Sequence, residues 1–376
     1  GNQFGLWGGA EIDGHLVLAA SGDTGVPIDG LVGTGKLTVE DGVVPSFDNG
    51  SGRDESLMAV DLDWQNTGTT ITVSTDYGFG KITSVNDLVV GNGVTANLTP
   101  KGGVVQHSEV TGLNLGTGAT LDMHTNNMSI DYSGGSTPLP QIEAWRTGGQ
   151  ILHHTEPHRV WAAYDDTSAQ VVSFGYAAWG DSNVNGLFDA QDRALMAVTK
   201  YNTGAPAGFS EGDWNQDGVF DTDDILETLQ VGGLVPGDYS TAEVMFSSGD
   251  ATLYYHFRKG TMWLTSAEQI SAVQIFSDMG VFTGDPALGL GGDFDVDLDE
   301  EITKILLPTA SFSMLDFGTV GVPGAVSLNG MQGDLSAEGA LYGGGLLNVD
   351  IVIIPEPASI VVLGLCGLLV LRRKRV

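Results

Sequence analysis

Short apolar stretches separated by glycine-rich turns fill the first 140 residues. One runs over residues 88–98, and a similar one over residues 113–123 follows 25 residues later. A Gly-x-Gly pair at 33–35 precedes another alternating stretch. Strand, glycine turn and strand at a fixed period is typical of stacked repeat units, each of which buries a face against the next. Residues 1–140 are therefore predicted to form a Gly-rich β-repeat region, either β-helix-like or an ordinary β-sandwich.

Alternation of apolar and polar positions returns after about residue 240. It is clearest over residues 253–257, 270–276 and 346–354, with glycine turns between the stretches. This pattern predicts an antiparallel β-sandwich over residues 239–353, and residues 141–179 form a transition segment. An acidic run at 293–297 lacks the turn glycine of a calcium loop, so we expect a solvated acidic turn there.

Composition supports a mainly β fold. The 376 residues include 55 glycines and only 16 % charged residues, which disfavours a helical bundle, and 41 % apolar residues can fill real cores. Forty-seven acidic residues against 15 basic ones give a net charge of −32. Bulk attraction to nucleic acid or to an anionic membrane surface is excluded, and divalent cations are the natural partners.

A duplicated segment in the middle of the chain has the spacing of EF-hand-type calcium loops. The copies cover residues 181–192 and 213–224, which are 32 residues apart. Oxygen-bearing side chains fall at positions 1, 3, 5, 9 and 12 of each copy, glycine falls at 6, and position 7 offers its backbone carbonyl. The predicted calcium ligands are Asp181, Asn183, Asn185, Leu187, Asp189 and Asp192 in loop one, and Asp213, Asn215, Asp217, Val219, Asp221 and Asp224 in loop two.

Calcium needs this spacing because it takes six to eight oxygens, which alternate residues of a tight loop direct inward. Two Asx-rich turns without metal are the alternative, since Asn, Asp and Gly are ordinary turn formers. Agreement between two copies favours metal, so we expect two calcium ions. Loop two has four acidic ligands and loop one has three, which predicts tighter binding by loop two.

A stretch with helical spacing follows each loop, and no full helix precedes either. Residues 180–238 thus resemble a type I dockerin, a family in which duplicated loop-helix units bind a cohesin domain and loop positions 10 and 11 help to choose the partner. Those positions are Ala190-Gln191 and Thr222-Asp223, which differ between the copies. The resemblance implies either a structural role, with docking against this chain's own neighbouring domains, or a cohesin-like domain of another protein as partner.

The last 23 residues, 354–376, contain a Pro-Glu-Pro motif, an apolar stretch and a basic end. The motif is Pro355, Glu356 and Pro357, and the basic end is Arg372, Arg373, Lys374 and Arg375. They resemble the PEP-CTERM sorting signal, which implies export, transient retention in the inner membrane, and cleavage by an exosortase-type enzyme. The mature protein would then lie at the cell surface or in the matrix, without the single cysteine, Cys366. This layout resembles exported proteins of planctomycete-like bacteria.

Candidate catalytic groups are weak. His153, His154 and His158 suggest zinc, but adjacent strand residues point to opposite faces, which favours a solvated loop. A Gly-x-Ser-x-Gly pattern at 208–212 runs directly into loop two and lacks the strand and helix that a nucleophile elbow needs. The sequence therefore predicts an exported, calcium-stabilised surface protein that acts by binding or assembly, not by catalysis. A polysaccharide lyase or hydrolase on the N-terminal repeats is the alternative, and a cohesin-recruited scaffold subunit is a second.

Overall fold

The computed structural model describes residues 11–19, 24–41, 43–49, 58–67, 69–101, 105–154, 159–231, 237–238, 248–256, 259–283, 290–307, 310–322 and 333–354. Within these ranges the protein is mainly β, as predicted. Its contacts divide it into two compact units, Gly1–Asp221 with Pro236–Glu243, and Thr222–Val235 with Val244–Val376. The dockerin-like segment 180–238 is thereby divided between the units. The sorting signal beyond Ile354 lies outside the described residues.

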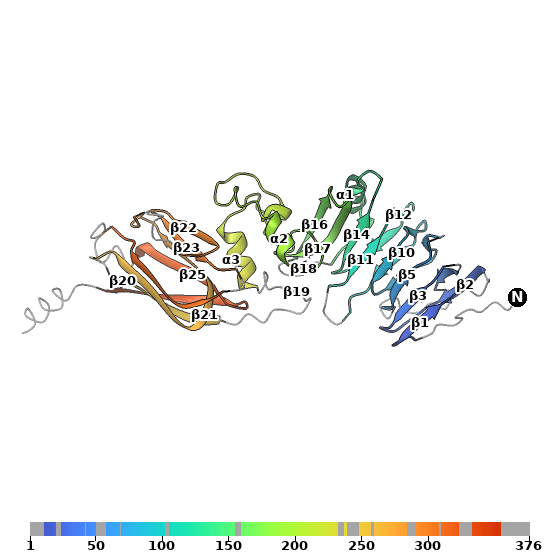
Figure 1. The fold of residues 1–376 in the computed structure, drawn as a ribbon, viewed down its shortest axis with the longest axis horizontal. Coiled ribbons are helices and arrows are strands. Elements are labelled where there is room, and N and C mark those ends of the chain that lie inside the picture. The colour runs from blue at the N-terminus through green and yellow to red at the C-terminus, as the bar shows by residue number, and fades with distance from the viewer. Residues whose placement is uncertain are drawn as a thin grey trace, which may run out of the picture. The chain divides into compact units, whose positions relative to one another are not determined.

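The first unit contains three sheets built from short strands that recur in turn along the chain (Figure 1). The longest consists, in order, of β1 (His15–Leu18), β3 (Lys36–Val39), β5 (Asp61–Trp64), β8 (Ile82–Ser84), β11 (His107–Val110), β14 (Asn127–Asp131), β17 (Val171–Ala178) and β16 (Arg159–Asp166). The second consists of β2 (Thr24–Asp29), β4 (Val44–Asp48), β6 (Ile71–Val73), β9 (Leu88–Val90) and β12 (Leu113–Leu115). The third consists of β7 (Tyr77–Phe79), β10 (Thr95–Leu98), β13 (Thr120–Asp122) and β15 (Ile151–Leu152).

Strands in these sheets pair in parallel, except at one end. The 25-residue spacing seen in the sequence is a pairing register: Leu88 pairs with Leu113, and Thr95 with Thr120. The next step in the third sheet is longer, because Leu121 pairs with Ile151 and the helix α1 (Leu139–Thr147) lies between them. The long sheet ends in antiparallel pairs of β17 with β14 and with β16.

The core of this unit is made by alternate residues of the short strands. Leu62, Ile82 and Leu121 are among those that are at most 2 % exposed, and Phe47 packs edge-on against Tyr77 with ring centroids 5.2 Å apart. Buried asparagines form hydrogen bonds with backbone groups of the preceding repeat, within this same unit. Asn126, which is fully buried, donates its Nδ2 to Leu98 O at 2.6 Å and accepts from Gln106 N at 2.9 Å. Each turn therefore fixes the position of the next strand.

The remaining elements of the first unit are short. They are β18 (Leu187–Phe188), β19 (Gly237–Asp238), the helix α2 (Ala190–Leu195) and a 3₁₀ turn (Phe209–Glu211). β18 pairs with β19 in antiparallel fashion.

The second unit contains one helix, α3 (Thr222–Gln230), and a sheet of seven strands among its described residues. The strands are β20 (Ser248–His256), β21 (Thr261–Ser277), β22 (Phe294–Asp297), β23 (Glu301–Ile305), β24 (Phe312–Thr319), β25 (Leu335–Leu341) and β26 (Leu346–Ile354). α3 contacts β25 and, to a lesser extent, β21. Its sequence carries apolar residues at helical spacing, and Ile225, Leu226 and Leu229 are buried.

Two expectations for the second unit are wrong. β20 and β26 pair in parallel, so the sheet is mixed rather than purely antiparallel. The acidic run at 293–297 is not a solvated turn, because Phe294–Asp297 forms β22 and pairs with β23. Phe294 and Val296 are buried at alternate positions, and this apolar alternation outweighs the turn tendency of the aspartates.

Replacing Asn126 tests the asparagine bonds. Asn126→Ala leaves the Leu98 carbonyl and the Gln106 N–H without their partner, so we expect a loss of about 1–3 kcal/mol in the free energy of unfolding. Urea unfolding followed by circular dichroism measures it. Asn114→Ala, at an exposed position of β12, is the matched control and should change stability by less than about 0.5 kcal/mol. Equal effects of the two variants would contradict the assigned role.

Candidate metal centre

The two predicted calcium loops follow different elements. Loop one begins three residues after β17 and leads into α2, which starts at its position 10. Loop two begins after the 3₁₀ turn, and α3 starts at its position 10. Within the described residues 159–212, no full helix lies directly before either loop, as the sequence predicts.

Three hydrogen bonds recur at the same positions of both loops. The N–H of position 6 donates to the carboxylate of position 1, in Gly186 to Asp181 (3.0 Å) and in Gly218 to Asp213 (3.1 Å). Position 5 donates to the side-chain oxygen of position 3, at 3.1 Å in loop one and 3.0 Å in loop two. Position 7 donates to position 5, at 2.8 and 3.0 Å. Each loop is thus closed by its own side-chain oxygens, which leaves further lone pairs for a cation.

Backbone conformation repeats as well. Glycine immediately before each loop has a positive φ, 99° at Gly180 and 115° at Gly212. Position 4 has φ of 59° at Val184 and 64° at Gln216, which is uncommon for residues other than glycine. Position 6 has φ of 84° and 103°, in the region that glycine adopts without strain. The agreement at three positions shows that the copies share one loop conformation.

Loop one concentrates acidic groups in a buried position. Asp181 and Asp192 are fully buried, and Asn183 is 6 % exposed. Burial, reinforced by the charge of Asp192, raises the pKa of Asp181 well above its usual value. Burial also raises the pKa of Asp192 to about 6, against the opposing effect of its hydrogen bonds. A cation between these carboxylates would relieve this desolvation cost.

Asp192 and Asp189 also shape the end of loop one. Asp189 caps α2 by accepting from Gln191 N at 2.6 Å, and Asp192 accepts from the backbone N–H groups of Asp189 (2.8 Å) and Asn183 (3.2 Å). The buried carboxylate at position 12 therefore connects position 3 to position 9. All of the predicted donors of loop one are oxygens, which fits calcium.

Loop two shows the same chemistry at its position 1. Asp213 is 5 % exposed, and burial raises its pKa above the usual value. Its Oδ1 has no hydrogen-bond partner within the described part of the chain. An unpaired buried carboxylate oxygen is costly, and a cation would satisfy it. Asp224, the predicted ligand at position 12, is fully buried at the start of α3 and belongs to the second unit.

The loops differ in their surroundings. Leu187 and Phe188 of loop one pair with β19, whereas Val219 of loop two forms an isolated bridge with Pro206. Trp214, fully buried, connects the loops by donating its Nε1 to Ser182 Oγ at 3.1 Å.

The side chains of the adjacent His153 and His154 contact different parts of the unit. His153 stacks on Trp161 and Tyr176, with ring centroids 5.7 and 5.2 Å away, whereas the exposed His154 lies over His124. The two adjacent histidines therefore do not face one site, as the alternation of a strand requires. His158 lies outside the described residues.

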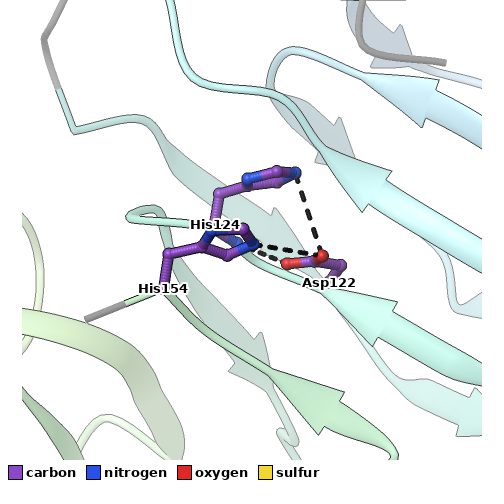
Figure 2. Close-up of side chains that lie close together, drawn as sticks. All are labelled: Asp122, His124 and His154. Atoms are coloured by element: carbon purple, nitrogen blue, oxygen red, sulfur yellow. Dashed lines mark hydrogen bonds and ion pairs between the residues drawn. The ribbon is translucent and has the colours of Figure 1, made fainter. Parts of the chain in front are cut away.

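A group of close side chains that the sequence analysis missed is formed by Asp122, His124 and His154 (Figure 2). A possible ligand atom of each lies within 4.8 Å of those of the other two. The pairing of β13 with β15 brings these side chains together, because it places residue 154 beside residue 124. The sequence did not reveal this pairing, because the 25-residue spacing does not hold across α1.

Comparisons with protein-family models, with curated proteins and with solved structures find no significant match to this chain. Within the described ranges, no helix has both the length and the apolar character needed to cross a bilayer.

Neutralising Asp181 tests loop one. Asp181→Asn removes a charged ligand at position 1, so we expect it to abolish about half of the rise in melting temperature that millimolar calcium produces. Differential scanning calorimetry in calcium and in chelator measures the rise. Asp299→Asn makes the same change at an exposed turn outside the loops and should keep the full rise. An undiminished rise in Asp181→Asn would exclude loop one as a calcium site.

Proposed function

We propose that this chain is an exported, calcium-stabilised surface protein that acts by binding or assembly, with two calcium ions held by the duplicated loops. The observation that carries the proposal is the repetition in both loops of three hydrogen bonds between backbone N–H groups and side-chain oxygens. Two positive φ values inside each loop and one immediately before it repeat as well. Isolated Asx turns need no such agreement over a whole loop, whereas binding of the same ion by both copies would account for it.

Electrostatics supports the same proposal. The buried pair Asp181 and Asp192 lies in a chain of net charge −32, where basic groups are few. The buried Arg159 lowers the pKa of Asp181 only against the larger effect of burial. Calcium that binds the folded loops and not the unfolded chain stabilises the fold by mass action, by about 2.7 kcal/mol at a hundredfold excess over Kd. Stability of the protein would then follow the calcium level outside the cell.

The surroundings of α3 favour the structural role of the dockerin-like segment over a partner in trans. The dockerin resemblance connects positions 10 and 11 of loop two with partner choice. Here Thr222, at position 10, is buried and Asp223, at position 11, is exposed, and both interact with strands of α3's own unit. Thr222 donates to Glu301 Oε1 at 3.4 Å, and Asp223 lies close enough to Glu338 to raise its pKa further beyond the effect of burial. Gln230, at the other end, donates to Gly339 O at 3.2 Å and accepts from Gly345 N at 2.8 Å.

We further propose that the N-terminal sheets form a parallel β-helix and that the second unit is a β-sandwich. Recurrence of strands in three parallel sheets supports the first assignment. For the second, β21 pairs with β20 through its first half and with β25 and β23 through its second half, so one long strand joins two groups of strands. Long, regular surfaces of this kind suit binding to polysaccharide or to other matrix proteins.

Export rests on the sequence of residues 355–376 alone. Retention in the inner membrane and cleavage by an exosortase-type enzyme stay predictions from the PEP-CTERM resemblance.

Calcium titration tests the central proposal. We expect isothermal titration calorimetry of the full chain to give two bound calcium ions, and Asp213→Asn to bind one, because position 1 of loop two loses its charge. Circular dichroism checks that the variant is folded. Absence of binding at millimolar calcium would overturn the proposal.

Truncating Leu226 tests the docking of α3. Leu226 lies one turn after Thr222 and one turn before Gln230, so it shares the face that both residues turn to the β sheet. It is 2 % exposed, and we expect Leu226→Ala to cost about 2–4 kcal/mol and to speed amide exchange in β25. Leu298→Ala, at a side chain that is 53 % exposed, is the control. Unchanged exchange in β25 would favour a helix face reserved for a separate partner.

A further inference from the structure

Two histidines occupy equivalent positions on successive strands of the third sheet. β13 and β15 pair in parallel, with Asp122 opposite Leu152. The pairing continues past both strand ends, because His154 N donates to His124 O at 3.0 Å. His124 and His154 therefore stand in register, and their rings stack with centroids 4.3 Å apart and planes inclined by 21°.

Asp122 faces both imidazoles. Its Oδ1 accepts from His124 N at 3.0 Å, which fixes the carboxylate in an Asx turn. Oδ2 then lies 3.4 Å from Nε2 of His154 and 3.9 Å from Nε2 of His124 (Figure 2). His124 itself has a φ of +49°, a left-handed conformation that turns its side chain toward the same place.

We propose that Asp122, His124 and His154 bind a divalent transition-metal ion of the zinc type at the surface of the first unit. Two imidazoles and one carboxylate are a donor set for zinc and its neighbours, whereas calcium takes oxygens alone. These three residues lie outside the two predicted calcium loops.

The donor atoms lie near the spacing that one ion requires. Ligands about 2.0–2.1 Å from a tetrahedral zinc ion lie about 3.3 Å from each other. The carboxylate to His154 distance is close to this value, and His124 has to approach the carboxylate by less than 1 Å. The two stacked imidazoles also have to turn so that both ring nitrogens point at the ion. The side chain of His154 is 56 % exposed and free to tilt, while that of Asp122, 16 % exposed, is held by its turn.

Solvent completes the coordination. Three protein ligands leave the fourth position of a tetrahedral ion to water, which the exposed side of His154 admits. A bound ion would also connect two strands that are separated in sequence by α1, and would thereby stabilise this end of the sheet. A histidine stack with an ordinary Asp to His contact is the alternative without metal.

The experiment uses the full chain, stripped of metal and returned to buffer with saturating calcium, so that the loops do not compete. Isothermal titration calorimetry with zinc chloride is expected to show one ion bound with micromolar or tighter affinity. Cobalt chloride is the second probe, since its visible absorption reports nitrogen and oxygen ligands in a tetrahedral site.

His154→Ala should weaken zinc binding at least about 100-fold, beyond the roughly 10–100-fold that loss of an outer partner costs. Its exposed side chain makes misfolding a minor concern, and Asp122→Asn, which keeps the acceptor for His124 N, is the second variant. His15→Ala, at an exposed histidine elsewhere in the unit, should bind zinc as the unaltered chain does. No zinc binding by the unaltered chain, or equal binding by His154→Ala and the unaltered chain, would overturn the proposal.

Discussion

Register between short parallel strands is the constraint on which the first unit depends. Each strand of the three described sheets is only two to eight residues long, too short to hold a position alone, and is held by ladders to the strands beside it in its sheet. Asparagines in the turns, such as Asn126, add hydrogen bonds between successive repeats of this unit. A shift of one residue would turn the apolar side of every strand outward, so burial of Leu62 or Leu121 fixes the register as firmly as the hydrogen bonds do.

The shape of the two predicted calcium loops is instead determined locally. Their shape follows from contacts within a few residues, where Asp181 and Asp213 accept from an N–H five positions further on. This is why positions 1 to 9 could be described from the sequence alone: spacing of side-chain oxygens and one glycine dictate the turn. The burial of the loops was less predictable, because it depends on neighbours such as Trp214. No local sequence pattern predicts the contact of Trp214 with Ser182.

The difference between local patterns and long-range pairing explains which features the sequence did not predict correctly. The 25-residue repeat was visible where the turns have equal length, but α1 lengthens the step from Leu121 to Ile151 and hides the pairing of His124 with His154. In the second unit, short-range alternation located most strands. It did not reveal that β26 returns parallel to β20, since that pairing joins residues about a hundred positions apart. The acidic run was misjudged because its aspartates were weighed without the buried Phe294 and Val296 between them.

The two proposed kinds of cation site would depend on these two sources of order. A local loop can gather many oxygens around one point, because consecutive residues are close together whatever the rest of the fold does. Imidazoles of distant residues meet only where strand register brings them together, as at His124 and His154. An acidic chain with few basic residues has more carboxylates than its own cations can neutralise. Metal ions bound at both kinds of site would supply positive charge where the fold buries or crowds these acids, and the stability of the fold would then depend on the metal-ion concentration.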